Sequence, residues 1–438
     1  MKAGKTLSSV IVWSLISAAF IGPGTITTAI SAGASYQLDL LWAVVFSTLA
    51  CLILQEVSAR LAIVSGLSMG QALIKKHGEK KGRLLNFILG GPVILGCIAY
   101  EAGNILGAVS GLNLIIPIDT RVLTILLTMF VAVILWTDRR QIIGWLMTLL
   151  VGLMGLAFFA LAIDQTFSFT HFVQASFTPR IPIGSELLVL GLVGTTIVPY
   201  NIFLGSGLSK GQTVSLMRTG LTISVLIGGF ITATILVAGT AVESFASFGE
   251  VALQLNNKLG PIGATALGIG LFAAGISSAI TSPYAASVIA SSIFSWNKRS
   301  QRLVWMVVLL AGFLFGISGV KPIPVILAVQ ALNGLVLPLL VAYLILLIND
   351  PFIIPQRHQH ARAYNVLLVG IFASVLFMGI HSVDKSISTW LYLDPGHFGA
   401  LISITVALTG YLTYRIFDLS KSGASEQGGS TPPPHRKL

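Results

Sequence analysis

The stretch Phe20-Ile-Gly-Pro-Gly-Thr25 decides the fold, because it interrupts the first hydrophobic segment of the chain. Apolar sequence runs from about residue 9 to residue 32, long enough to cross a lipid bilayer as a helix. Proline removes a backbone donor and glycine weakens a helix, so we expect a break at Gly22, Pro23 and Gly24 and a new helix near Thr25. A break at membrane depth exposes backbone groups that lipid cannot satisfy. Such breaks bind substrates and ions in transporters, and the alternative is a simple proline kink.

The composition places the whole chain in a membrane. Of its 438 residues 55% are hydrophobic and 9% are charged, whereas soluble proteins have about 25% charged residues. The net charge of +11 would suggest nucleic acid in a soluble domain, but the positive-inside rule explains it better and no aromatic-rich basic patch is present. Cys51 and Cys97 both lie in apolar segments, so we expect neither a disulfide framework nor a metal site from them.

Hydropathy predicts about twelve spanning helices, and therefore an all-α polytopic membrane protein. Basic residues concentrate in alternate connections, on the side that holds both termini, as in the run Lys75, Lys76, Lys80, Lys81 and Arg83. The positive-inside rule then predicts a multi-pass protein of the cell inner (plasma) membrane with both termini in the cytoplasm. Residues 1–8 would form a cytoplasmic N-terminus. The Gly-, Ser- and Pro-rich residues 420–438 would form a disordered cytoplasmic tail.

A second interrupted helix lies five spans after the first. In Gly194-Thr-Thr-Ile-Val-Pro-Tyr-Asn201 a proline falls in the middle of the sixth apolar span. Two interrupted helices at corresponding positions of two halves indicate an inverted-repeat transporter with its site at the membrane midplane. The two repeats would cover residues 9–163 and 186–348, with two further helices in residues 363–416. Chance kinks are the alternative, and the matched spacing favours the transporter.

Ionisable residues inside the predicted spans are scarce, and each is costly in a bilayer. Glu101 is the only acid near the middle of a span. We interpret it either as a proton carrier, because burial raises the pKa of a carboxyl group, or as a neutral, hydrogen-bonded structural residue. Glu56 lies four residues before Arg60, which is the spacing of an ion pair on one helix face, and we prefer that structural interpretation.

Hydroxyl and amide groups gather in several of the predicted spans. An isolated Ser or Thr most often joins two helices across a membrane interface. The group Ser277, Ser278 and Thr281 differs, because its spacing puts three hydroxyls on one helix face just before a proline. Hydroxyls together with free carbonyls suit a hard cation such as Na⁺, so we interpret this group as a candidate site for a coupling ion.

These segments together resemble the NRAMP (natural resistance-associated macrophage protein) divalent-metal transporters over most of residues 9–348. Residues 54–66 are similar to the family's second helix and residues 274–281 to its eighth. Glu101 falls on the family's third-helix glutamate, and the segment around Gln330 resembles its tenth helix. The resemblance implies a LeuT-like fold, an inverted repeat of five plus five helices with two extra helices, in which the first and sixth helices are unwound around a central site.

The sequence departs from the family pattern where metal would bind. The family's first motif has a metal-binding Asp and Asn, and this chain has Gly22 and Thr25 instead. The sixth-helix motif of the family has Met and His, and this chain has Val198 and Tyr200. Only Glu101 keeps a charge. Mn²⁺ and Fe²⁺ need anionic, imidazole or thioether ligands, so we expect no transition-metal site here.

Loss of the aspartate leaves the positive end of the restarted helix facing the site without an opposing charge, and helix N-termini bind anions. We therefore expect a secondary active transporter, working by alternating access, for a small carboxylate-bearing solute such as an amino acid or organic acid. The expected substrate-binding residues are Gly22, Thr25, Thr28, Val198, Tyr200, Asn201, Gln330 and Asn333. The expected residues for a coupling ion are Glu101, Ser277, Ser278 and Thr281.

Two alternatives stay open. One is a divalent-metal transporter for Mn²⁺, Fe²⁺ or Mg²⁺ that uses Glu101, Gln330 and backbone carbonyls, and the other is a sensor that transports nothing. No pattern suggests an enzyme, since the Gly-x-Ser-x-Gly string at residues 66–70 follows a membrane helix rather than a strand. We expect no cofactor beyond a coupling Na⁺ or H⁺. The expected partners are a small-molecule or ion substrate and the lipid bilayer, without nucleic acid, and a monomer is the simplest assembly.

Overall fold

The computed structural model describes residues 2–427 except 164, 210, 295, 356–357 and 392–397, and its regular elements over these residues are all helices. Within those helices it describes only the backbone of residues 2–6, 140, 322, 324–335, 382, 385–387, 389–391, 398 and 420–427.

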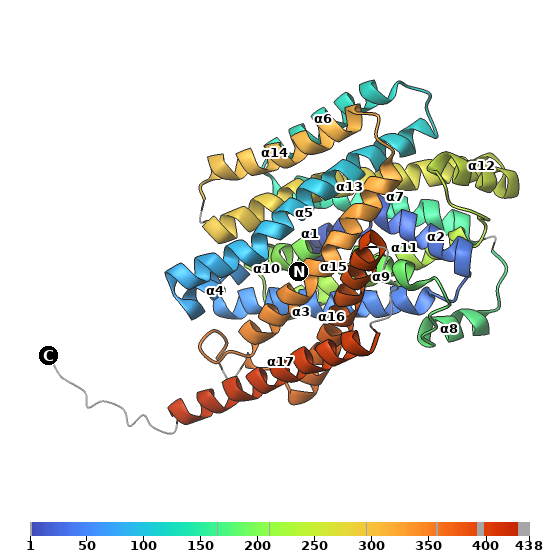
Figure 1. The fold of residues 1–438 in the computed structure, drawn as a ribbon. Coiled ribbons are helices and arrows are strands. Elements are labelled where there is room, and N and C mark those ends of the chain that lie inside the picture. The colour runs from blue at the N-terminus through green and yellow to red at the C-terminus, as the bar shows by residue number, and fades with distance from the viewer. Residues whose placement is uncertain are drawn as a thin grey trace.

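Seventeen helices lie side by side in one bundle (Figure 1). Those of the first half are α1 (Lys2–Phe20), α2 (Pro23–Tyr36), α3 (Leu41–Ser65), α4 (Met69–His77), α5 (Glu79–Asn113), α6 (Thr120–Trp136), α7 (Arg140–Ala162) and α8 (Phe169–Phe177). The second half contains α9 (Glu186–Thr196), α10 (Pro199–Leu208), α11 (Val214–Gly239), α12 (Phe248–Leu259), α13 (Pro261–Phe294), α14 (Lys298–Ile317) and α15 (Pro322–Ile348). Two helices follow, α16 (Arg362–Leu391) and α17 (Phe398–Gln427).

The predicted number of membrane spans agrees with these helices. Within the described residues, nine helical segments are long and apolar enough to cross a bilayer, the pair α9–α10 counting as one, and the bent pair α1–α2 makes a tenth. The apolar helix α6 and the apolar end of α15, Val336–Ile348, are shorter. Together these segments account for the twelve spans that hydropathy predicts, and the chain is a multi-pass membrane protein.

Both predicted helix breaks are present. Leu7–Phe20 and α2 meet at 61° across Ile21 and Gly22. The second break separates α9 from α10 at Ile197 and Val198. Each new helix begins with a proline, where the missing N–H removes no helical hydrogen bond and the fixed φ already suits a helix.

The two longest helices, α5 with 35 residues and α13 with 34, pack closely against each other. A Cβ atom at Gly111 would collide with the backbone of Phe272, and one at Gly275 with the backbone of Ala108. Small residues at such points allow two helix backbones to approach, which is the packing that membranes favour. Because α5 and α13 pack so closely, Glu101 of α5 lies in the same layer of the bundle as Ser277, Ser278 and Thr281 of α13.

Some ends and short helices differ from the sequence prediction. The helices α4, α8 and α12 were not predicted, and each begins at a serine whose hydroxyl accepts a backbone N–H of the first turn. The backbone of α17 is helical to Gln427, whereas the sequence predicted a disordered tail from residue 420. An existing helix grows without a new nucleus, and Ala, Lys, Glu and Gln of this segment favour helix. Residues 428–438 lie outside the described residues.

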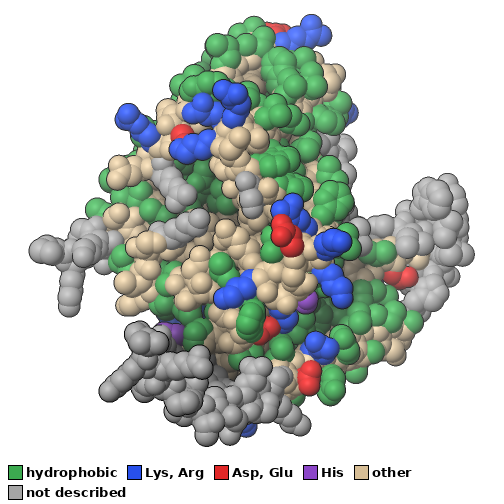
Figure 2. All heavy atoms as spheres, turned by 90° about the vertical axis from the view of Figure 1, so that its left-hand side faces the viewer, with side chains coloured by type: hydrophobic (Ala, Val, Ile, Leu, Met, Phe, Trp, Pro, Cys, Tyr) green, Lys and Arg blue, Asp and Glu red, His purple; other side chains and the backbone are tan. Residues whose placement is uncertain are grey.

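Lysine and arginine gather at one end of the bundle, which is at the left of Figure 1 and faces the viewer in Figure 2. On this face blue basic side chains are more numerous than red acidic ones (Figure 2). We call this end of the bundle, which carries α4 with Lys75 and Lys76 in its last turn, the basic face (Figure 1). The positive-inside rule would place it in the cytoplasm, and that orientation stays a prediction.

Candidate functional site

The first helix break is held by hydroxyl side chains. Ile21 N–H bonds the carbonyl of Ser17, but the carbonyls of Ala18, Ala19 and Phe20 have no helical partner because α1 ends there. Each of the three accepts a hydroxyl instead: Ser277 and Ser278 donate to Ala18 at 3.3 and 3.4 Å, Tyr200 donates to Ala19 at 2.7 Å, and Thr25 donates to Phe20. Because buried carbonyls are rarely left unpaired, these hydroxyls stabilise the unwound backbone.

The start of α2 faces α13 and α5. Gly22 is the N-cap residue of α2, without a side-chain hydrogen bond to the first turn and without an acidic residue in that turn. A Cβ atom at Gly22 would lie 2.8 Å from Ser278 Oγ and 3.7 Å from Asn104 Oδ1. Asn104 Nδ2 in turn donates to Glu101 Oε2 at 3.4 Å. The structure therefore joins the break in the first span to Glu101 through Ser278 and Asn104.

The start of α10 carries an amide without a partner. Val198 is the N-cap residue and provides no side-chain cap, and the first turn of α10 has no acidic residue. Asn201 in that turn is fully buried, and neither its Nδ2 nor its Oδ1 has a hydrogen-bond partner among the described residues. Tyr200 beside it packs edge-on against Tyr100 of α5, with ring centroids 5.9 Å apart.

The predicted residues for a coupling ion lie together but are engaged in different ways. Besides its bond to Ala18, Ser277 Oγ donates to Ala274 at 3.0 Å, and Thr281 Oγ1 donates to Ser277 at 3.0 Å. Hydroxyls that only stabilise helix packing make the same bonds to carbonyls. A hydroxyl that donates its proton still has lone pairs with which it can bind a cation. Glu101 is fully buried, and its Oε1 has no hydrogen-bond partner among the described residues.

The remaining predicted residues are less central or outside the described side chains. Thr28 donates to the carbonyl of Gly24 within α2, at 2.9 Å. Gln330 and Asn333 lie in α15, but their side chains are outside the described residues.

The space beside the second break is small in this conformation. A cavity of about 10 Å³ lies between α5, α10 and α15, lined by residues that include Tyr100, Pro199, Tyr200 and Val336. That volume is near the limit for one water molecule. A solute that binds here needs the helices around Tyr200 to separate, as alternating access requires.

Sequence reasoning did not select Tyr100, Asn104 or Gln55 for this region. Asn104 lies three residues after Glu101, which is the spacing of neighbours on one helix face, so this signal was available. Gln55 Oε1 is buried next to Gly205 of α10, and no described residue bonds it. No local pattern connects Gln55 with Gly205, since they are far apart in the sequence.

A separate charged network lies near the basic face. Arg60 Nε is 3.2 Å from Glu56 Oε1, so the predicted ion pair is confirmed. The same Glu56 also accepts two bonds from Arg218 of α11, at 2.8 and 2.9 Å, and one from the Tyr364 hydroxyl of α16, at 2.9 Å. Arg60 Nη2 lies 3.2 Å from His360 Nδ1, and burial lowers the pKa of His360, so its neutral ring can accept this bond near pH 7. The network joins three helices from different parts of the chain.

Comparison with known families matches residues 14–383 to the family described as natural resistance-associated macrophage protein-like (Nramp). The chain belongs to the Nramp family. Its structure is similar to that of the manganese transporter of Eremococcus coleocola in complex with an aromatic bis-isothiourea substituted compound, with 19% sequence identity, 95% of each chain covered and a TM-score of 0.76. It is also similar to Mhp1, a nucleobase-cation-symport-1 family transporter, with 14% identity, 93% and 92% of the chains covered and a TM-score of 0.53.

These similarities show the LeuT-like fold that the resemblance implied, and they are to transporters rather than to enzymes. The described residues offer few metal ligands. Over the described part of the chain, no group of three His, Cys, Asp or Glu side chains could hold a metal ion. At the two breaks, Gly22 and Val198 offer no side-chain donor atoms, and Glu101 is the nearest carboxylate that the described contacts connect to them.

Proposed function

We propose that this Nramp-family protein is a secondary active transporter for a small carboxylate-bearing solute, such as an amino acid or an organic acid. The observation that carries the proposal is the buried Asn201 amide, which has no hydrogen-bond partner among the described residues and lies in the first turn of α10, where no side chain provides a cap. Its NH₂ group can donate to a carboxylate, and the positive end of the helix dipole at this turn favours an anion. Gly22 likewise gives the start of α2 no side-chain cap.

The charge balance at the breaks supports an anion over a bare cation. Neither first turn carries an acidic residue that would oppose the positive end of its helix. Among the described residues, Glu101 is the carboxylate that the contacts connect to this place, and one carboxylate does not compensate a divalent ion, whose desolvation is costly. The fold does not choose between the two classes of solute: one similar structure is a manganese transporter, and the other, Mhp1, has bromovinylhydantoin bound.

The test is a thermal-shift screen of the purified protein, followed by uptake into proteoliposomes. We expect an amino acid or small organic acid, and neither Mn²⁺ nor Mg²⁺, to stabilise the wild type. Asn201→Ala should weaken binding of that acid about 10- to 100-fold, which corresponds to about 1.5–3 kcal/mol for a hydrogen bond to a charged group. Asn201→Asp is the matched control, because it keeps the size of the side chain and adds a negative charge that repels the acid.

A second candidate is the divalent-metal transporter. Glu101 Oε1 and Asn201 Oδ1 favour it, because both are buried oxygen atoms without a partner in the described part of the chain, and a hard cation could use them. Stabilisation by Mn²⁺ or Mg²⁺ that disappears in Glu101→Gln, with no response to any organic acid, would establish this candidate and refute the first. Absence of flux for every solute tested would instead indicate a sensor.

A further inference from the structure

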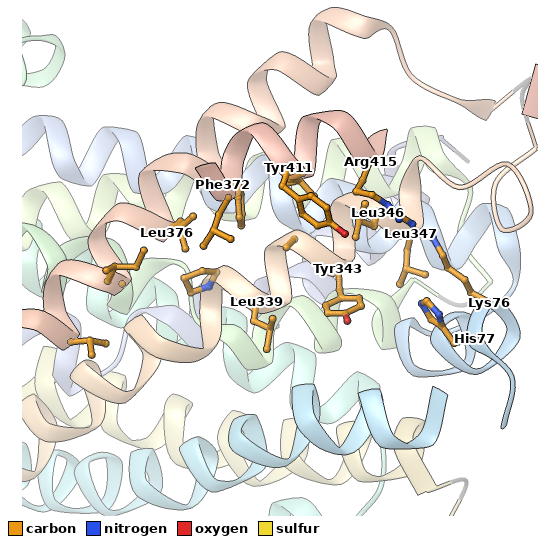
Figure 3. Close-up of a pocket in the computed structure, with 17 residues that line it drawn as sticks. Lys76, His77, Leu339, Tyr343, Leu346, Leu347, Phe372, Leu376, Tyr411 and Arg415 are labelled. Atoms are coloured by element: carbon orange, nitrogen blue, oxygen red, sulfur yellow. The ribbon is translucent and has the colours of Figure 1, made fainter. Parts of the chain in front are cut away.

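A groove of about 610 Å³ lies away from both helix breaks, between α15, α16, α17 and the end of α4 (Figure 3). Its walls are mostly apolar, with Leu339 and Leu346 from α15, Phe372 and Leu376 from α16, and Leu412 from α17. Helices α16 and α17 are long and apolar enough to cross a bilayer, and the end of α15 beside them is apolar, so these walls stand at the depth of the hydrocarbon core. An apolar groove at that depth is filled by hydrocarbon.

One end of the groove is polar and basic. Lys76, His77 and Arg415 lie together there, on the basic face of the bundle (Figure 3). Asp350 neutralises Lys76, since its Oδ2 lies 2.6 Å from Lys76 Nζ, so Arg415 supplies the surplus positive charge. Burial and the charge of Lys76 lower the pKa of His77, so near pH 7 its ring is neutral and adds hydrogen-bonding capacity without charge.

The length of the groove matches one leaflet of a bilayer. The lining residues of α15 run from Pro338 to Leu347, which is about 14 Å of helix at 1.5 Å per residue. Half of a hydrocarbon core of about 30 Å is about 15 Å. The basic end is therefore at the level of lipid head groups when the apolar part lies among acyl chains.

We propose that this groove binds one anionic phospholipid from the leaflet on the basic face. The acyl chains lie between α15, α16 and α17, and the phosphate bonds Arg415, with Lys76 and His77 beside it. Every bilayer lipid can supply the chains, so the selectivity comes from the charged end. Basic pockets between membrane helices recognise acidic head groups in this way. The site is independent of the solute that the central region transports.

The test is native mass spectrometry of the purified full-length protein, titrated with phosphatidylglycerol or phosphatidylcholine of the same acyl chains. We expect phosphatidylglycerol to be retained at least fivefold more strongly, and Arg415→Gln to remove most of that preference, since one basic side chain near a membrane surface contributes about this factor. The exposed Arg299, also on the basic side but outside the groove, provides the control Arg299→Gln, which should keep the preference.

Two further measurements distinguish the phospholipid from other ligands of the groove. Inorganic phosphate and glycerol phosphate, which lack acyl chains, should not compete with the lipid at matched concentration. Ala342→Trp fills the groove without changing its charge and should reduce binding of both lipids. Equal retention of the two lipids by the wild type, competition by free phosphate, or unchanged lipid binding in Ala342→Trp would each overturn the proposal. If Arg415→Gln does not fold, the wild-type preference and Ala342→Trp still decide it.

Discussion

Three consecutive carbonyls, those of Ala18, Ala19 and Phe20, would be orphaned by the break in the first span if hydroxyl side chains did not bond them. The donors come from α2, α10 and α13, so the break is stable only when these three helices are in place around it. Opening of the site must exchange these bonds for bonds to water or to a solute. The hydroxyls that the sequence suggests for a coupling ion thus also stabilise the break in the conformation described.

Tyr200→Phe tests this arrangement. The variant keeps the ring that packs on Tyr100 but leaves the carbonyl of Ala19 buried without its 2.7 Å bond. We expect a loss of about 1–3 kcal/mol in the free energy of unfolding, the usual cost of an unsatisfied buried polar group, measured by thermal or denaturant unfolding in detergent. Tyr36→Phe is the control, because the Tyr36 hydroxyl makes an exposed, 3.3 Å bond to Ile183. Equal effects of the two variants would contradict the prediction.

Gly22→Asp combined with Thr25→Asn tests the charge of the site. The pair restores the carboxylate and amide of the family motif, so we expect Mn²⁺ binding to appear or strengthen and binding of an organic acid to weaken. The side chain at position 22 would meet Ser278 Oγ, 2.8 Å from its Cβ. Adding Ser278→Ala should therefore strengthen Mn²⁺ binding further, as measured by isothermal titration. If neither variant changes the binding of metal or acid, the first break is not part of the site.

At the scale of helices, the network around Glu56 connects α3, α11 and α16 close to the basic face. In the repeats predicted from the sequence, α3 and α11 belong to different halves, and α16 lies outside both. Glu56 is thus a point at which the repeats and the additional helices are joined. Its role is structural, as the sequence interpretation of an ion pair suggested, but with more partners than one helix can supply.

Glu56→Gln should destabilise the protein by about 3 kcal/mol, because it leaves the buried Arg60 without its counter-charge. The value lies at the low end for buried pairs, since the other arginine, Arg218, is 57% exposed and can turn to water. The control is Glu79→Gln, which removes a surface pair with Arg83 and should change the free energy of unfolding by less than about 1 kcal/mol. Denaturant unfolding of both variants measures the difference, and similar losses would show that the network contributes little.

The helix breaks could be predicted from the sequence because their cause is local: a proline next to glycines in Gly22-Pro-Gly24, and Pro199 in the middle of an apolar span, each disfavour a continuous helix. Proline alone does not decide it, since α5 and α13 continue through Pro92 and Pro283. The i,i+4 pair of Glu56 and Arg60 could be predicted because its cause is local too. Arg218 and Tyr364 could not, since they lie 162 and 308 residues from Glu56 and no local pattern relates them. The same holds for the hydroxyls of α13, whose spacing suggested an ion site but whose bonds to Ala18 depend on how two distant helices pack.

At the scale of the whole molecule, the Nramp family and the LeuT-like fold leave the driving ion open. Two groups on the closely packed α5 and α13 are candidates: Glu101 for H⁺, and Ser277, Ser278 and Thr281 for Na⁺. Asn104 bonds Glu101, and both Asn104 and Ser278 lie beside Gly22. A movement of α2 would therefore change the surroundings of both candidate groups.

Replacement of Na⁺ by choline at fixed pH should lower solute uptake into proteoliposomes several-fold, because the hydroxyl group of α13 with nearby carbonyls suits Na⁺. Thr281→Val should have the same effect, since it removes a hydroxyl at nearly constant size. If uptake is unaffected by choline but is abolished by collapse of the pH gradient and by Glu101→Gln, the coupling ion is H⁺.

The contact between Gly22 and Ser278 also constrains the order in which mutations can accumulate. A descendant that acquired a carboxylate at position 22 while Ser278 kept its present rotamer would meet a steric clash before it gained any metal. Rotation of the Ser278 hydroxyl relieves that clash, and a smaller residue at position 278 removes it. The effect of a substitution at position 22 therefore depends on the residue at position 278 of a second helix, so the two positions are epistatic.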